Sequence, residues 1–361
     1  MNPLKKLTAY GQSIWLDLLD RELMNSGKLK KLIEEDDLRG LTSNPSIFEK
    51  AITGSSDYDA GIEKSAKDNP DPASVFFDLA VSDIRQAADI FKPVFEKTGG
   101  KDGFVSLEVT PDLAYKTRET IEQVRYLWKK VNRKNAMIKI PGTGEGIGAI
   151  RQCLSEGINI NITLLFGIPR YREITEAFMG ALEDRLKQGK PIKDIASVAS
   201  FFLSRIDVIT DPVLEEKKAK HLKGKIAIAS AKTAYAVYQE MISSKRFENL
   251  AKHGARPQRL LWASTSTKNP EYSDVLYVEN LIGADTINTL PIRTIDAFRD
   301  HGKVTASLTK NAEEAGENLA ALKKLNIDLD SITRRLEEEG VEKFNTAYKS
   351  LLQSIEKKSR L

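Results

Sequence analysis

The chain alternates short apolar segments with longer amphipathic ones, and this alternation restricts its possible folds more than any other feature. Strands that alternate with helices are typical of parallel β-α units, and eight such units predict a closed (β/α)8 barrel, the TIM barrel. The rival is an open doubly wound sheet, which is less favoured because no G-x-G-x-x-G turn follows the first expected strand. The eight expected strands are residues 13–17, 38–44, 104–109, 137–140, 158–164, 195–200, 259–264 and 286–290.

Length and composition are compatible with a single domain. The chain has 361 residues, 41% of them hydrophobic, and one barrel with insertions reaches this size. We expect one domain over residues 1–361, with a surface insertion near 50–72. The segment near 308–361 exceeds what eight units need, so we expect it to form a helical cap in which one helix ends near Gly340.

The charge pattern argues against several partners. The formal net charge is only +4, and no cluster of cations with aromatic residues, typical of nucleic-acid binding, is present. No apolar run is long enough to span a membrane, and the polar segment after Lys6 does not resemble a signal peptide. Because Cys153 is the only cysteine, a reducing compartment is favoured. We therefore expect a cytoplasmic protein with no nucleic-acid or membrane partner.

Lys139 lies in the middle of the apolar strand at 137–140. Lysine is seldom buried without a reason. One reason is that burial disfavours the ammonium form, which makes the amine a nucleophile toward carbonyls. The other is structural: the side chain snorkels to solvent or pairs with a carboxylate. From this strand alone, the structural interpretation is favoured.

Other polar residues lie at or near the ends of the expected strands. In the fifth strand Asn159, Asn161 and Thr163 share one face, which we expect to point into the barrel. The carboxyl ends of barrel strands build active sites. Each residue alone has a structural explanation, such as a helix cap, but a ring of them is hard to explain that way. The residues at the other strand ends are Asp17, Asn44, Glu108, Lys139 and Ser200.

Lysine and carboxylates together favour Schiff-base chemistry on a carbonyl. The three histidines, His221, His253 and His301, lie far apart in sequence and are better explained as surface residues than as metal ligands. We expect neither a metal nor a cofactor.

Five sequence blocks resemble the transaldolases, class I aldolases of the pentose phosphate pathway. The resemblance covers roughly residues 10–290, and the blocks follow the family's order. They are Leu-Thr-Ser-Asn-Pro-Ser-Ile-Phe at 41–48, Ser-Leu-Glu-Val-Thr-Pro at 106–111, Ile-Lys-Ile-Pro at 138–141, Gly-Ile-Asn-Ile-Asn-Ile-Thr-Leu-Leu-Phe at 157–166 and Ser-Phe-Phe-Leu-Ser-Arg-Ile-Asp at 200–207.

The resemblance implies catalytic roles for four residues. Lys139 would form the Schiff base with the ketose. Asp17 would act as acid and base on the hydroxyl beside the cleaved bond. Glu108, together with Thr163, would hold and activate a water molecule.

It also implies substrate contacts. Asn44 and Asn161 would bind the dihydroxyacetone unit, Ser200 and Phe202 would line the site, and Arg205 would meet the substrate phosphate.

The chain departs from the family pattern after the seventh strand. Ser264 matches the family serine, but Ser266 stands where the pattern Ala-Ser-x-Arg has an arginine, and the nearest cation is Lys268. Either Lys268 or Ser266 would then complete the phosphate site.

The function implied is transfer of a dihydroxyacetone group from sedoheptulose 7-phosphate or fructose 6-phosphate to glyceraldehyde 3-phosphate or erythrose 4-phosphate. Two alternatives remain open: aldol cleavage of fructose 6-phosphate without transfer, and a phosphosugar-binding barrel without turnover. Intact Lys139, Asp17 and Glu108 argue against the second. Phosphorylated sugars are the expected ligands, and the sequence is compatible with a monomer or a homodimer.

Overall fold

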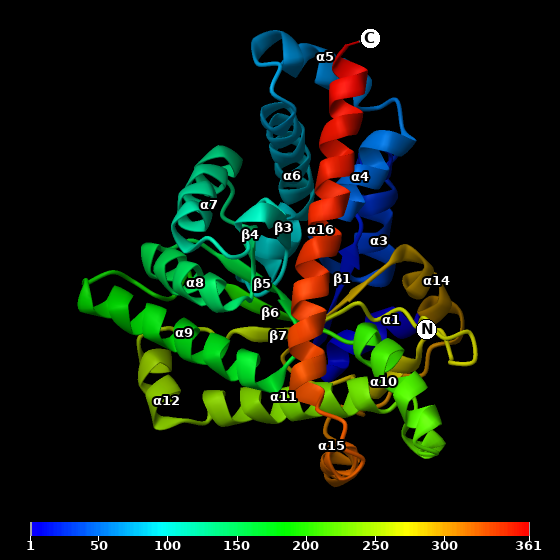
Figure 1. Cartoon of the computed structure of the whole chain (residues 1–361). Coiled ribbons are helices and arrows are strands. Elements are labelled where there is room, and N and C mark those ends of the chain that lie inside the picture. Colours follow the sequence, from blue (N-terminus) through cyan, green and yellow to red (C-terminus); the bar gives the residue numbers. More distant parts are fainter. Residues whose placement is uncertain (1, 361) are drawn as a thin grey trace.

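The computed structural model describes residues 2–360 and contains a closed parallel barrel. The strands follow one another around the barrel in sequence order, and β8 pairs with β1 to close it. Figure 1 shows the strands at the centre of the molecule, with helices around them. Closure confirms the predicted (β/α)8 barrel and rules out the open sheet. The strands are β1 Gln12–Asp17, β2 Leu38–Thr42, β3 Phe104–Glu108, β4 Ala136–Pro141, β5 Ile160–Leu165, β6 Ser197–Phe202, β7 Arg259–Ala263 and β8 Thr286–Leu290.

Helices surround the barrel, and several short ones were not expected from the sequence. Pro111 is compatible with the first turn of a helix, but here it opens only a 3-10 turn, and the α-helix begins at Thr117. The helices are α1 Pro3–Leu7, α2 Arg21–Asn25, α3 Lys28–Asp36, α4 Pro45–Gly54, α5 Asp59–Asp68, α6 Pro72–Lys97, α7 Thr117–Val131, α8 Gly144–Glu156, α9 Ile168–Lys187, α10 Ser204–Glu216, α11 Ile226–Ile242, α12 Lys245–Lys252, α13 Leu276–Asn280, α14 Ile292–His301, α15 Ala312–Lys324 and α16 Leu329–Ser359.

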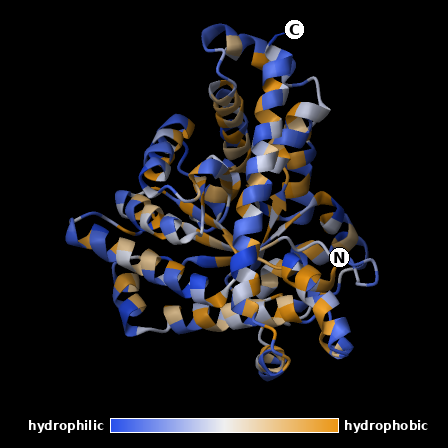
Figure 2. Cartoon of the chain, in the orientation of Figure 1, coloured by the Kyte–Doolittle hydropathy of each residue, from blue (hydrophilic) through white to orange (hydrophobic). Residues whose placement is uncertain are grey.

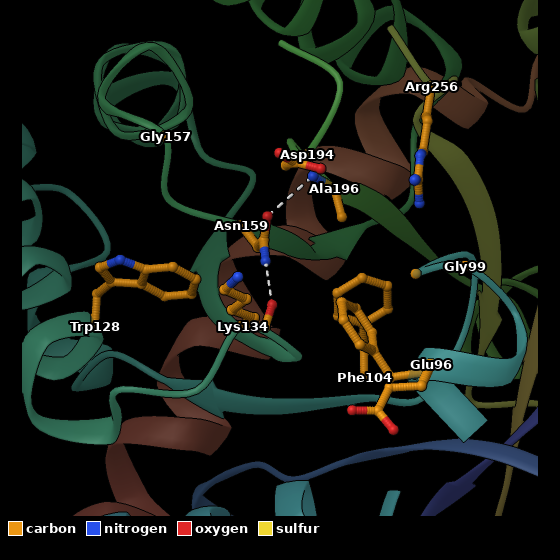
Figure 3. Close-up of a pocket in the computed structure, with 12 residues that line it drawn as sticks. Glu96, Gly99, Phe104, Trp128, Lys134, Gly157, Asn159, Asp194, Ala196 and Arg256 are labelled. Carbon is orange, nitrogen blue, oxygen red and sulfur yellow. Dashed lines mark hydrogen bonds between the residues drawn. The ribbon is translucent and has the colours of Figure 1, made fainter. Parts of the chain in front are cut away.

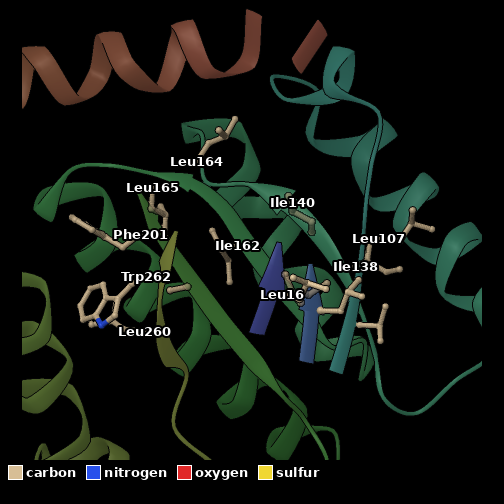
Figure 4. Close-up of a cluster of buried hydrophobic side chains, with 14 of the residues drawn as sticks. Leu16, Leu107, Ile138, Ile140, Ile162, Leu164, Leu165, Phe201, Leu260 and Trp262 are labelled. Atoms are coloured by element: carbon tan, nitrogen blue, oxygen red, sulfur yellow. The ribbon is translucent and has the colours of Figure 1, made fainter. Parts of the chain in front are cut away.

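Two apolar layers hold the barrel. Between the strands and the helices lies the main core, where Ile138, Ile162 and Leu260 are fully buried (Figure 4). Inside the barrel a second cluster, which includes Trp15 and Met137, fills the lumen. Coloured by hydropathy, the strands at the centre are mainly apolar, while the surrounding helices carry polar residues on their outer faces (Figure 2). The filled lumen leaves space only at the ends of the barrel.

The last helix, α16, crosses the mouth formed by the carboxyl ends of the strands (Figure 1). The expected helix end near Gly340 is wrong, because α16 continues through it. A Cβ at Gly340 would lie 3.0 Å from Cδ2 of Leu164, so the missing side chain permits close packing on the end of β5. Gly340 thus allows close helix–strand packing and does not end the helix.

Residues 50–72, expected as a surface insertion, are largely helical and pack against α16. They contain the end of α4 and all of α5. Lys358 Nζ lies 2.6 Å from an Asp59 carboxylate oxygen, and Ser350 Oγ donates to Glu49 Oε1 at 3.2 Å. The helices α4, α5 and α16 therefore form one layer over one side of the mouth. The division into one domain with an insertion and a cap stays a prediction.

Candidate active site

A cavity of about 370 Å³ opens at the carboxyl ends of the strands, beneath α16. Most of the predicted site residues line it. Glu108 and Asn161 do not, because they lie deeper in the barrel. The predicted residues that line the cavity are Asp17, Asn44, Lys139, Thr163, Ser200, Phe202, Arg205, Ser264 and Lys268.

Lys139 and Glu108 form a buried ion pair at the bottom of this cavity. They are paired in register on β4 and β3, and Nζ lies 3.3 Å from Oε2 of Glu108. Their side chains are only 6% and 3% exposed, so Lys139 does not snorkel to solvent. Nζ also donates to the carbonyl oxygen of Ser43 at 2.9 Å. Pairing with a carboxylate therefore describes the surroundings of Lys139, and a paired carboxylate is also the group that can take up the proton of a lysine that reacts.

Burial dominates the acidity of Glu108. It raises the pKa of the carboxyl to about 6, and the nearby Lys139 ammonium opposes the rise. Both Glu108 oxygens lack a hydrogen-bond donor among residues 2–360, and so does the buried Thr163 hydroxyl. The contact with Lys139 is ionic, without hydrogen-bond geometry. Buried acceptors of this kind are suited to holding a water molecule.

Asp17, at the end of β1, is the second carboxylate of the cavity. Thr42 Oγ1 donates to its Oδ1 at 2.9 Å and also lies 2.9 Å from the Thr289 hydroxyl. Burial raises the pKa of Asp17, while Lys139, the Thr42 hydrogen bond and Lys268 lower it. Lys139 thus lies close to two carboxylates, Asp17 and Glu108, whose pKa values are both raised above those of carboxylates in water.

The segment after β2 fixes both the lysine and the entrance to α4. Besides accepting from Lys139 through its carbonyl, Ser43 donates its hydroxyl to the Ser106 carbonyl at 2.8 Å. Asn44 Oδ1 accepts from the Ile47 amide at 3.0 Å and caps α4, which Pro45 opens. The helix-cap explanation for Asn44 is therefore correct, and its amide nitrogen remains available at the cavity wall.

Asn161 lies inside the barrel, on the predicted face of β5. Its Nδ2 donates to Ser106 Oγ at 3.0 Å, and its Oδ1 accepts from Ser200 Oγ at 2.7 Å. Asn161 therefore links β3, β5 and β6 below the cavity. Asn159, on the same face, lies near the opposite end of the barrel and donates to the carbonyls of Lys134 and Ala136.

Cations gather at the rim. Arg205, in the first turn of α10, and Lys268, after β7, both line the cavity. Burial lowers the pKa of Lys268, and Arg205, Arg293 and Lys343 lower it further. Glu339, the one acidic residue that perturbs Arg205, forms its own ion pair with Arg335. Unbalanced positive charge at a cavity rim favours an anionic ligand.

Ser264 adopts a left-handed backbone conformation with φ 55°. Its hydroxyl lies 2.9 Å from that of Ser204, and its carbonyl accepts from the Ser204 amide, which ties β7 to the start of α10. Phe202 packs its ring against Phe166 at 5.2 Å between centroids and presents an aromatic wall to the cavity.

A larger cavity, of about 410 Å³, lies at the opposite end of the barrel (Figure 3). It is lined by residues that precede or begin the strands, among them Phe104, Lys134, Asn159 and Arg256. We do not place the chemistry there, because barrel active sites lie at the carboxyl ends of the strands and the lysine–carboxylate group is at that end. Within residues 2–360 no group of three or more His, Cys, Asp or Glu side chains is arranged to hold a metal.

Several residues that line the cavity or contact Lys139 were missed by the sequence analysis. Thr42 and Ser43 precede Asn44 directly, and the run Thr-Ser-Asn-Pro at a strand end was a signal that could have included them. Lys50 and Phe344 also line the cavity, but they come from helices that only the three-dimensional fold brings to the mouth.

The fold and its polar mouth place the chain among the (β/α)8-barrel enzymes. The sequence model of the Transaldolase/Fructose-6-phosphate aldolase family matches residues 14–355, and the chain belongs to this family. It is 46% identical to the transaldolase of Trichodesmium erythraeum, covering 99% of this chain and 97% of that protein. It is 45% identical to transaldolase 2 of Nostoc punctiforme, covering 100% and 98% of the two chains. With the transaldolase of Thiobacillus denitrificans the identity is 44%, over 98% of this chain and 100% of the other.

Proposed function

We propose that this protein is a transaldolase that transfers dihydroxyacetone between phosphorylated sugars of the pentose phosphate pathway. The observation that carries the proposal is the buried pair of Lys139 and Glu108, 3.3 Å apart, beside the second buried carboxylate of Asp17. Full-length relatives named transaldolase support the same activity. The donors would be sedoheptulose 7-phosphate or fructose 6-phosphate, and the acceptors glyceraldehyde 3-phosphate or erythrose 4-phosphate.

In the proposed reaction, the neutral amine of Lys139 attacks the ketose carbonyl. Glu108, whose pKa of about 6 lies close to neutrality, takes up the ammonium proton, because a base is most useful when its pKa is near the working pH. The carbonyl oxygen leaves as water, and a protonated Schiff base remains. A water molecule held between Glu108 and Thr163 relays these protons.

Asp17 acts on the carbon–carbon bond. As its carboxylate accepts the proton of the hydroxyl beside that bond, the bond breaks, and its electron pair moves toward the Schiff base. The aldose departs, and dihydroxyacetone stays on Lys139 as an enamine. The enamine then attacks the acceptor aldehyde, Asp17 returns the proton, and hydrolysis frees the new ketose and the lysine.

The remaining predicted residues bind the sugars in this proposal. Arg205 and Lys268 face the phosphate, since a guanidinium or ammonium forms strong charge-assisted hydrogen bonds with it. Asn44 contacts the dihydroxyacetone unit. Asn161 is predicted to contact the same unit, and Ser106 and Ser200 hold its amide group. The reaction as proposed uses no cofactor.

Within residues 2–360 no helix is long and apolar enough to cross a membrane. We place the enzyme in the cytoplasm, because the one thiol, on Cys153, is buried and free and a reducing compartment suits it.

Borohydride trapping tests the covalent step. Incubation with fructose 6-phosphate and borohydride should add a three-carbon group to the peptide that contains Lys139, as read by mass spectrometry. Lys139→Ala should give no adduct, whereas Lys134→Ala, which changes an exposed lysine at the other end of the same strand, should still give it. An adduct on another lysine would refute the assignment. Adding erythrose 4-phosphate should produce a seven-carbon ketose, and free dihydroxyacetone without that product would indicate simple aldol cleavage.

A further inference from the structure

The loop between β7 and α13, residues 264–275, carries Lys268. Few side chains support this loop on the side that faces α10, because a cavity of about 380 Å³ lies between the loop and that helix. Lys268 lines this cavity as well as the mouth. Packed side chains on both sides would normally fix such a loop. Lys268 therefore depends on other contacts to hold its place.

The loop is anchored on each side of Lys268. Before it, the buried Thr265 hydroxyl donates to the Thr289 carbonyl on β8 at 3.2 Å. After it, the Tyr272 hydroxyl donates to Asp211 Oδ2 on α10 at 2.5 Å. The other Asp211 oxygen accepts from the Gly224 amide at 3.0 Å, so this carboxylate joins three segments.

Gly224 also makes room for the tyrosine ring. Its φ is +70°, and a Cβ there would lie 3.0 Å from the Tyr272 ring. One turn nearer to Arg205 on the same helix, Asp207 accepts from the Tyr277 hydroxyl at 2.8 Å. Two tyrosine–aspartate bonds thus fasten the loop and the helix after it to α10.

The helix that receives these bonds also carries Arg205. Burial lowers the pKa of Lys268 and Arg205 lowers it further, whereas Asp17 raises it. Lys268 is therefore repelled by Arg205, which lines the same cavity, and attracted by Asp17. No carboxylate forms an ion pair with Lys268 in the described part of the chain; its ammonium instead donates to Ser266 Oγ at 2.7 Å. Without an anion between them, repulsion would drive the loop away from α10.

We propose that Tyr272, held by Asp211, is a positioning residue that keeps Lys268 at phosphate-binding distance from Arg205. This inference rests on the proposed function only in that the anion is a sugar phosphate. The hydrogen bond between Tyr272 and Asp211 offsets part of the unfavourable energy of holding two cations close together, so the site is formed before the phosphate binds.

The first test measures binding of inorganic phosphate by calorimetry. Tyr272→Phe removes one hydroxyl and should weaken binding by about two- to twelvefold, the range for one hydrogen bond. The matched control is Tyr235→Phe, because the Tyr235 hydroxyl donates to the Ala284 carbonyl at the other end of the barrel, at 3.1 Å. This control should bind phosphate as the wild type does.

A double-mutant cycle tests whether Tyr272 acts through the lysine. Lys268→Met should weaken phosphate binding by itself, and adding Tyr272→Phe should then change nothing further. With fructose 6-phosphate, Tyr272→Phe should raise KM by the same factor while kcat is retained. Gly224→Ala places a Cβ 3.0 Å from the Tyr272 ring, so it should also weaken phosphate binding.

Wild-type affinity in Tyr272→Phe, or an equal loss with and without Lys268, would overturn the proposal. The phosphate measurement also separates it from the proposed function. A wild-type protein that binds phosphate through this coupling but transfers no dihydroxyacetone would refute only the function. A wild-type protein that binds no phosphate would refute the positioning role.

Discussion

Replacing Glu108 with glutamine should remove a pH dependence from the free energy of unfolding. Burial raises the pKa of this carboxyl from 4.5 to about 6 in the folded protein. Below pH 4.5 the group is protonated in both states, and its contribution to stability is fully present. As the pH rises, the unfolded chain releases the proton first, so this stability is lost as the pH passes through about 6.

The size of the effect follows from the two pKa values. A difference of about 1.5 corresponds to about 2 kcal/mol. Urea unfolding of the wild type and of Glu108→Gln, at several pH values between 4 and 7.5, gives the two stabilities. The wild type should lose about 2 kcal/mol relative to the variant between pH 4.5 and 7.

Two further variants check the cause. Glu63 is exposed, and its hydrogen bond with Lys67 lowers its pKa. The stability difference between wild type and Glu63→Gln should therefore depend on pH with the opposite sign, since this contribution of the wild type is lost as the pH falls. In Lys139→Met the Glu108 pKa should rise above 6, because Lys139 is the group that opposes the rise. A flat difference between wild type and Glu108→Gln would show that the carboxyl is solvated and refute the argument.

Three more outcomes are expected. Asp17→Ala should still form the borohydride-trapped adduct but turn over about 10²- to 10⁴-fold more slowly, while Glu108→Ala should slow trapping itself; equal trapping rates would contradict this division of roles. Arg205→Ala should lower kcat/KM for fructose 6-phosphate by about 10- to 150-fold with little effect on unphosphorylated fructose, and an equal loss with both sugars would exclude a phosphate contact. Gly316→Ala places its new Cβ where no atom lies within 4 Å, so it should raise the free energy of unfolding in urea by about 1 kcal/mol. Gly340→Ala should raise it less, or lower it, because the new Cβ meets Leu164. Equal gains in the two variants would mean that α16 does not pack tightly on β5.

The barrel, and which polar residues point into it, were predictable because both follow from local patterns in the sequence. Alternation along β5 puts Asn161 on the inner face, and its bonds to Ser106 and Ser200 confirm that orientation. Parallel strands bring their carboxyl ends to one face, so Lys139 and Glu108 were expected near each other. That they are direct neighbours depends on the register of β3 and β4, which the sequence does not reveal.

Contacts made across long sequence separations were not predictable. The sequence predicts a helix end near Gly340, because glycine is common at helix ends. Instead Gly340 lets α16 approach Leu164, a residue far away in the chain. In the sequence, nothing distinguishes Arg293 and Lys343 from other charged residues of helices. Only the positions of α14 and α16 at the mouth bring their positive charges close enough to lower the pKa of Lys268. Local sequence patterns contain no information about contacts between residues that lie far apart in the chain.

The cationic rim and the carboxylates below it are electrostatically coupled. Burial raises the pKa of Asp17, and Lys268 is among the groups that lower it. If Asp17 must be ionised to accept the hydroxyl proton, the acidic limb of kcat/KM reports its pKa. Lys268→Met should then move this limb to higher pH, whereas the Glu108 titration should stay, because Lys268 is not among the groups that shift it. An unmoved limb would mean that Asp17 does not limit the rate at low pH. A bound phosphate neutralises the same lysine, so substrate binding itself should make Asp17 a stronger base for the bond it helps to break.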